Sequence, residues 1–161
     1  MTAVQNPTLA AMRKSGKPDH FFGQGVCLRA QMHGAATVVG ATGELDASNI
    51  HHLTNYVRRY LSGDRPLVLD LSQPDFLAAQ GIRCLFEIAD ECDRNGIEWA
   101  LVSGRPVLRF LRICDKDAWL PAVASIDEAV QCFSAPWGRK DYCSSSRSRA
   151  NVRVSRRDTC I

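Results

Sequence analysis

Residues 67–81 read LVLDLSQPDFLAAQG, and this stretch decides the fold of the chain. Leu67–Leu71 is apolar at nearly every position, which is typical of a β-strand covered on both faces. Ser72–Asp75 has the polar and proline residues of a turn. A helix is predicted to begin at Ala78–Gly81, because the following residues place their apolar side chains on one stripe at helical spacing. The stretch therefore combines a buried strand, a short turn and the start of a helix.

Strand and helix patterns alternate along the rest of the chain. Val26–Gln31 and Thr37–Ala41 predict a β-hairpin around the turn His33-Gly34. Because strands alternate with helices, the sequence predicts an α/β domain with a mostly parallel sheet of about four to five strands packed with helices. The other predicted elements are a helix that follows the N-cap Ser48 and stops at Ser62-Gly63, a strand at Pro66–Leu71, a helix from Ala79 to Arg94 that ends at Asn95-Gly96, a strand at Trp99–Val102, a helix opened by Gly104-Arg105-Pro106 with Cys114 facing inward, a strand at Val123–Ala124 and a helix from Asp127 to Phe133.

Length and charge divide the chain into three segments. The 161 residues, 45% of them apolar, are enough for one domain with a core. Residues 1–20 carry a net charge of +2 without a periodic apolar pattern, and they predict a flexible N-terminal arm. Residues 21–133 hold ten basic and fourteen acidic residues and form the predicted domain. Residues 134–161 have a net charge of +5, are rich in Ser, Arg and Cys, and predict a disordered basic tail.

Composition also argues against several locations and chemistries. No apolar run approaches the ~20 residues that cross a bilayer, and no apolar segment follows the basic residues near the N-terminus. A cytoplasmic protein without membrane insertion is therefore expected. The seven cysteines, odd in number and irregularly spaced, do not indicate a secreted disulfide framework. The tail is either a basic arm with weak affinity for nucleic acid or anionic surfaces, or an extension without function, and neither predicts a specific nucleic-acid partner.

Four short motifs resemble the STAS domain family, which includes the bacterial anti-sigma factor antagonists (anti-anti-sigma factors). Phe76–Gly81, FLAAQG, resembles the family's signature F-[ILM]-D-[ST]-[ST]-G. Gly43–Asp46 is similar to its GELD turn, Leu69–Ser72 to its DLS strand end, and Ser125–Ala129 to its closing S-x-x-E-A helix. The resemblance extends over residues 24–133, approximately, and implies the STAS fold.

The same resemblance implies a binding function that has lost its usual switch. In this family the first hydroxyl after the signature Asp is the usual phosphate acceptor, at a helix start that favours an anion. Ala79 occupies that position here, and neither Ala79 nor Gln80 can be phosphorylated. Ser72 lies nearby and either substitutes as the acceptor or bonds the local backbone. The resemblance therefore implies a phosphorylation-independent antagonist, or one with another switch.

The expected docking surface surrounds this helix start. Asp46 could equally be a turn residue and Phe76 a core residue. An uncharged Ala-Gln surface at a helix start is compatible with a close protein interface. The implied partner is a serine-kinase-like anti-sigma factor, whose binding would free a sigma factor, and small-molecule binding is not expected. Carried over from the family position by position, the surface consists of Glu44, Asp46, Phe76, Ala79, Gln80 and Arg83.

Cysteine is the candidate for a different switch. Cys84 lies one turn into the signature helix, and Cys114 ends the next predicted helix. A disulfide between them would need Cα atoms roughly 4.4–6.8 Å apart, and the neighbours Arg83 and Arg112 could lower the thiol pKa values. Alternatively, the cysteines are small hydrophobic residues. No metal site is predicted, because there is no C-x-x-C motif and His51-His52 lack a third ligand.

The sequence predicts neither an enzyme nor a cofactor. It has no P-loop, no G-x-G-x-x-G and no nucleophile elbow. Glu87 and Glu91, one turn apart, are typical of a solvated helix face. Gly104-Arg105 is typical of the start of a capped helix, although this helix start could also hold an anion. Two alternatives to the antagonist stay open: a STAS subunit of a membrane transport complex, such as a lipid-transporting ABC system, and a degenerate scaffold of a larger signalling particle. Fold alone does not decide between them.

Overall fold

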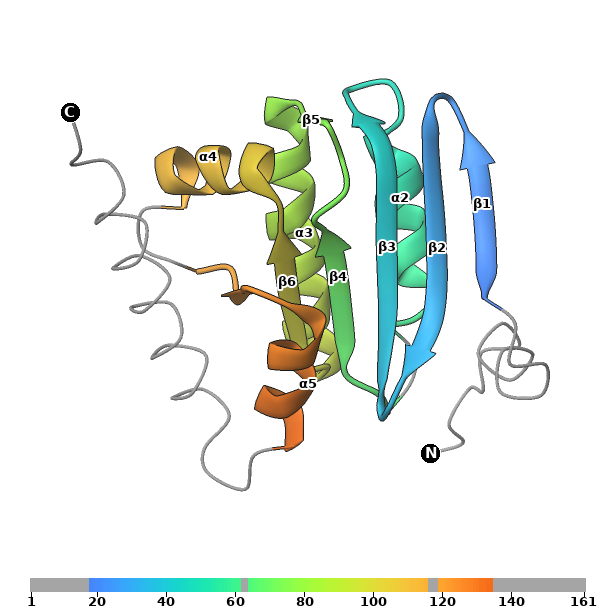
Figure 1. Ribbon diagram of the computed structural model, residues 1–161, viewed down its shortest axis with the longest axis vertical. Helices are drawn as coiled ribbons and strands as arrows, with labels where there is room; N and C mark the ends of the chain where they lie inside the picture. Colours follow the sequence, from blue (N-terminus) through green and yellow to red (C-terminus); the bar gives the residue numbers. More distant parts are fainter. Residues whose placement is uncertain (1–17, 62–63, 116–118, 135–161) are drawn as a thin grey trace.

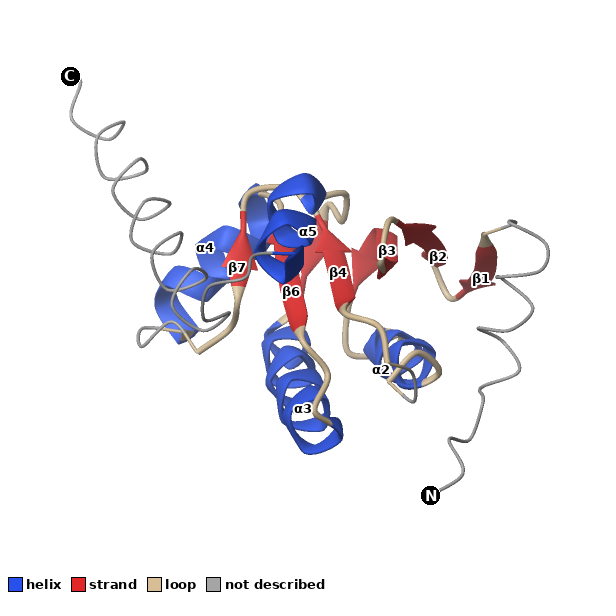
Figure 2. Ribbon diagram, turned by 90° about the horizontal axis from the view of Figure 1, so that it is seen from below, coloured by secondary structure: helices blue, strands red, loops and turns tan. Residues whose placement is uncertain are grey.

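The computed structural model describes residues 18–61, 64–115 and 119–134, which form one mixed β-sheet with helices on both faces (Figures 1 and 2). Its elements are β1 (Asp19–Gly23), β2 (Val26–His33), β3 (Ala36–Leu45), α2 (Ile50–Arg58), β4 (Leu67–Leu71), β5 (Phe76–Leu77), α3 (Ala79–Asn95), β6 (Trp99–Ser103), α4 (Arg105–Cys114), β7 (Ala122–Val123) and α5 (Ile126–Ser134). The order of the sheet is β1-β2-β3-β4-β6-β7, and β5 pairs separately with β3.

The sheet has an antiparallel part and a parallel part. β1, β2 and β3 pair antiparallel, whereas the pairs β3–β4, β4–β6, β6–β7 and β3–β5 are parallel. The predicted hairpin is confirmed, and its strands extend further than predicted, to the pair His33 and Ala36. The mostly parallel α/β sheet is likewise confirmed. The carboxyl ends of the parallel strands all lie at the same end of the sheet, and β5 and the start of α3 lie at that end (Figure 1).

Two helical layers cover the sheet. α2 and α3 lie on one face and α5 on the other (Figure 2), while α4 packs against α3, β5 and β6 at the carboxyl end of the parallel strands. Leu67 and Leu69 of β4 point into the larger apolar core with α2 and α3, and Val68 points into the smaller one with α5. This alternation explains why the strand is apolar on both faces.

The number of strands predicted from the sequence, about four to five, is wrong, because the sheet has seven. β5 and β7 contain two residues each, too few for an alternating pattern to be recognised. β1 begins at Asp19, inside the segment predicted to be a flexible arm, and alternates between half-buried and exposed residues without a fully buried one. It pairs with β2 along all five of its residues, and Asp19 also accepts a hydrogen bond from the Tyr60 hydroxyl at 2.7 Å. Residues 1–17 of the predicted arm lie outside the described residues.

Three helix details also differ from the prediction. The residue at the N-cap of α2 is Asn49, not Ser48, and Asn49 makes no side-chain hydrogen bond to the helix. The Ser48 hydroxyl donates to the Asp46 carboxylate at 2.6 Å. Cys114, expected to face inward, is exposed at the last position of α4. α5 includes Ser134, the first residue of the predicted basic tail, and the remainder of that tail lies outside the described residues.

Candidate docking surface

The six residues of the predicted docking surface, Glu44, Asp46, Phe76, Ala79, Gln80 and Arg83, are here called the helix-start surface. They come from the end of β3, from β5 and from the first turns of α3. In the parallel ladder between β3 and β5, Glu44 is the register partner of Phe76, and Leu45 is that of Leu77. Both leucines are fully buried, whereas Glu44 is exposed and 48% of Phe76 is exposed. The ladder therefore fixes Phe76 and Glu44 side by side at the surface.

The start of α3 presents an uncharged, uncapped end. Its N-cap, Ala78, has extended dihedral angles and provides no side-chain hydrogen bond to the helix, and Ala79 and Gln80 are exposed. Gly81 packs so closely on the strand below it that an added Cβ would lie 2.2 Å from Leu77 Cδ1. The small signature glycine therefore lets the helix begin directly above β5, and no side chain of the N-cap residue bonds to the first N–H groups of the helix.

Asp46 is primarily a turn residue. Its carboxylate accepts hydrogen bonds from the Ser48 hydroxyl at 2.6 Å and from the Ser48 backbone N–H at 2.7 Å, and these bonds lower its pKa. These contacts agree with the interpretation of Asp46 as a turn residue. Whether Asp46 also touches a partner stays a prediction.

Asn49 is a positioning residue that the sequence analysis missed. It is 1% exposed, and its amide donates to the Glu44 carbonyl at 2.7 Å and to the Gln24 carbonyl at 3.0 Å, while its carbonyl accepts from the Asp46 N–H at 3.0 Å. These three bonds hold the end of β3 against the start of α2 and the β1–β2 turn. The signal in the sequence was an Asn immediately before a helical pattern, a residue type that favours N-caps.

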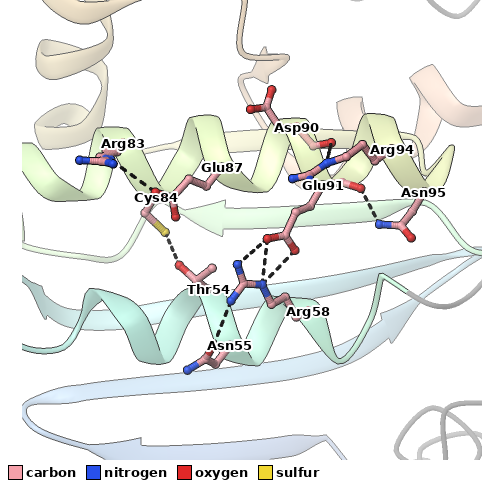
Figure 3. A network of polar contacts seen from close by, with 10 residues as sticks. All are labelled: Thr54, Asn55, Arg58, Arg83, Cys84, Glu87, Asp90, Glu91, Arg94 and Asn95. Carbon is pink, nitrogen blue, oxygen red and sulfur yellow. Dashed lines mark hydrogen bonds and ion pairs between the residues drawn. The ribbon is translucent and has the colours of Figure 1, made fainter.

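Arg83 and Cys84 lie in the network between α2 and α3 shown in Figure 3. The Arg83 side chain is 85% exposed and pairs with Glu87 at 3.4 Å, so it points away from the thiol. Cys84 is buried, and its sulfur lies 2.8 Å from the Thr54 hydroxyl. Burial raises the pKa of the Cys84 thiol to about 11, opposite to the effect expected from a neighbouring arginine. Cys84 and Cys114 are both free, and a redox switch at these two thiols stays a prediction.

Glu87 and Glu91, one turn apart on α3, are both engaged in ion pairs. Arg58 Nε donates to the two Glu91 carboxylate oxygens at 2.8 and 3.0 Å (Figure 3), which lowers the pKa of Glu91. Glu87 pairs with Arg83 instead. Glu91 therefore ties α3 to α2, and its side chain is only 18% exposed, whereas Glu87 pairs within α3 and is half exposed, as expected for a solvated helix face. Among the residues that the structure describes, no group of three or more His, Cys, Asp or Glu side chains could hold a metal ion.

Ser72, the alternative phosphate acceptor, lies in the β4–β5 turn. Its N–H donates to the Asp70 carboxylate at 2.9 Å, and its carbonyl touches Gly104, where an added Cβ would lie 2.6 Å from that oxygen. Gly104 also donates its N–H to the Leu71 carbonyl at 3.0 Å. The start of α4 therefore packs against the turn that contains Ser72.

The chain belongs to the STAS domain family, whose model matches residues 28–129. It is 36% identical over 110 residues to Osmosensory protein A of Mycobacterium tuberculosis, a match that covers 66% of this chain and 70% of that protein. It is 31% identical over 104 residues to the anti-sigma-F factor antagonist RsfA of the same species, covering 62% of this chain and 81% of RsfA.

Solved structures confirm the fold. An anti-sigma factor antagonist from Mycobacterium paratuberculosis superposes with a TM-score of 0.60 at 21% identity, over 68% of this chain and 95% of that one. The unphosphorylated form of the antagonist SpoIIAA gives a TM-score of 0.53 at 15% identity, over 64% and 92% of the two chains. In the described part of the chain, no helix is both long enough and apolar enough to span a membrane.

Proposed function

We propose that this protein is an anti-sigma factor antagonist that binds a serine-kinase-like anti-sigma factor through the helix-start surface and thereby frees a sigma factor. Membership of the STAS family and the name of the relative RsfA support the proposal. The observation that carries it is the exposed pair Ala79-Gln80 at an uncapped helix start, directly beside the exposed ring of Phe76.

The chemistry of this surface suits a close protein interface. Phe76 supplies a partly exposed aromatic ring on a strand fixed by backbone hydrogen bonds, and aromatic residues are enriched at the centres of interfaces. Ala79 and Gln80 add no charge that would have to be desolvated. Glu44 on one side and Arg83 on the other provide charges at the rim, where they favour one orientation of the partner.

The usual phosphorylation switch of the family is proposed to be absent. A phosphate at the start of α3 would add a charge of about −1.5 to −2 in the middle of this surface. Ala79 and Gln80 have no hydroxyl, and the Ser72 backbone serves the turn below α4. Binding is therefore proposed to be independent of ATP, with the antagonist controlled by its abundance or by its partner.

The test is the affinity of the full chain for purified anti-sigma factors, starting with the anti-sigma-F factor of Mycobacterium tuberculosis that RsfA is named for, measured by titration calorimetry. Micromolar or tighter binding is expected, and Phe76→Ala should weaken it at least tenfold, or about 1.4 kcal/mol. Phe22→Ala is the matched control, because Phe22 is 74% exposed on β1, the outermost strand, which β2 separates from β3 (Figure 1). Absence of binding to every anti-sigma factor, or equal loss in the two variants, would contradict the proposal.

A further inference from the structure

α4 carries a stripe of three arginines on its exposed side, here called the arginine stripe: Arg105, Arg109 and Arg112. Residues four and seven positions apart lie within about 60° on a helix with 3.6 residues per turn, so the three side chains share one face. The opposite side of α4 is used by the core, where Val107 and Leu111 are buried. This cationic helix belongs to a domain, residues 21–133, with fourteen acidic and ten basic residues. The net charge of the domain is therefore negative, whereas the stripe is a local concentration of positive charge.

Two of the three arginines, Arg105 and Arg109, are unfavourably placed in the helix, whereas Arg112 lies in its last turn, where a positive charge is favoured. Arg105 is the first residue of α4, where the helix dipole disfavours a positive charge, and α4 has no acidic residue in its first turn. Arg109 follows at the i+4 position, where like charges repel. Positions that break local rules without a local gain are expected at functional sites.

The described part of the chain provides no ion pair for the stripe. Within the described residues, none of the three arginines lies within salt-bridge distance of an acidic side chain. The nearest acidic residue in sequence, Asp115, uses its two carboxylate oxygens to accept the backbone N–H groups of Trp119 at 2.7 Å and Leu120 at 3.0 Å. The positive charges are therefore available to a binding partner.

The stripe begins next to the helix-start surface. The start of α4 is fastened to the β4–β5 turn, where Gly104 touches Ser72, and that turn leads directly into Phe76 of β5. α4 also packs against β5 and α3 (Figure 1). A partner seated on Phe76 and the start of α3 would thus reach Arg105 first and the other two arginines along the helix.

We infer that the arginine stripe binds an acidic surface of the same anti-sigma factor, extending the helix-start surface along α4. The inference rests on the proposed function. An acidic protein surface fits better than an anionic membrane, because the apolar side of α4 is consumed by the core and the rest of the domain is acidic. Exposed Ile113, beside Arg112, adds an apolar contact of the kind found in protein interfaces.

The test measures the association rate constant of the full chain with the anti-sigma factor that it binds, at about 50 mM and about 0.5 M NaCl, because screening removes surface electrostatics at high salt. Arg105→Glu with Arg109→Glu should reduce the rate about tenfold or more at low salt and less than about twofold at high salt. The matched control, Arg29→Glu with Arg94→Glu, makes the same change in charge at exposed sites on β2 and at the end of α3, and should leave the rate within about twofold.

A second readout separates binding from stability. Because Arg105 and Arg109 are unfavourable in the free helix, the glutamate variant should melt at the same temperature as the wild type or higher, and the milder Arg105→Gln with Arg109→Gln should give an intermediate rate. A lower melting temperature for both variants would overturn the inference in favour of a structural role.

The remaining outcomes distinguish the two proposals. Equal rates for the stripe variant and its control would overturn the inference alone, provided that Phe76→Ala still weakens binding. Failure of the wild type to bind any anti-sigma factor would overturn the antagonist function and this inference with it. Sedimentation of the wild type, but not of the stripe variant, with phosphatidylserine-containing vesicles, together with unchanged association rates, would assign the stripe to a membrane.

Discussion

Glu44 and Phe76 are register partners in the two-residue ladder between β3 and β5, so a charged and an aromatic side chain are fixed next to each other beside the start of α3. The backbone on both sides of the pair is anchored, by Asp75 N–H to the Gly43 carbonyl at 3.2 Å and by Ala78 N–H to the Leu45 carbonyl at 2.8 Å. The helix-start surface is therefore built on sheet hydrogen bonds, and its geometry depends on a few residues beneath it.

Gly81→Ala tests the close packing of α3 on β5. The added methyl group would overlap Leu77, which is fully buried, so we expect the free energy of unfolding to fall by about 1–3 kcal/mol in urea titrations. Gly40→Ala is the control, because an added Cβ on β3 meets nothing closer than 4.0 Å. A loss of stability in Gly40→Ala as large as that in Gly81→Ala would show that the contact with Leu77 is not the cause.

Asn49→Ala tests the hydrogen bonds that hold the end of β3, including the backbone of Glu44, in place. The substitution removes three hydrogen bonds and leaves two carbonyls and one N–H without their partner, so we expect a loss of about 2–4 kcal/mol in the free energy of unfolding. Binding to the anti-sigma factor should also weaken, because the end of β3 loses its anchor. Asn55→Ala, on the exposed side of α2, should change the free energy of unfolding by less than about 0.5 kcal/mol. Similar effects of the two substitutions would contradict the role assigned to Asn49.

Stability should fall at alkaline pH because of two buried thiols. Burial raises the pKa of Cys84 to about 11 and that of Cys92 to about 12, whereas thiols in the unfolded chain titrate near about 8.5. The stabilising contribution is complete below the unfolded pKa and is lost as the pH rises toward the folded values, by up to about 1.4 kcal/mol per pH unit for each thiol. Urea titrations between about pH 7.5 and 10 measure this slope.

The matched variant for the pH measurement is Cys84→Ala with Cys92→Ala. It removes the two buried thiols whose pKa values are raised, so its free energy of unfolding should depend much less on pH over the same range. A wild-type protein whose stability stays constant between about pH 8 and 10 would contradict the burial of these thiols.

The strand, turn and helix at residues 67–81 could be predicted because each obeys a local rule: a doubly buried strand, a turn rich in polar residues, and an apolar stripe that ends at Gly96 with a left-handed conformation. β5 could not, because two residues carry no periodicity and its pairing with β3 is a tertiary contact. The exposure of Phe76 follows from that pairing, so the sequence left core and docking interpretations equally open.

The side-chain environment of Cys84 was the least predictable part of the site. Arg83 adjoins it in sequence, but successive residues on a helix point about 100° apart, and Arg83 faces solvent while Cys84 faces Thr54 of α2. Asn49 was missed for a related reason. Its residue type favours an N-cap, but its side chain bonds to the Gln24 and Glu44 carbonyls instead of capping α2, and these are tertiary contacts.

The measurement that tests the central claim most directly is the affinity of the wild type and of Ala79→Ser for a kinase-fold anti-sigma factor, with and without ATP and Mg²⁺. The account predicts that the affinity of the wild type is the same with and without ATP. Ala79→Ser restores a hydroxyl at the start of α3, so this variant should be phosphorylated in the presence of ATP and its affinity should fall at least tenfold. A wild-type protein that loses affinity in ATP, with stoichiometric phosphate on residues 72–83, would contradict it.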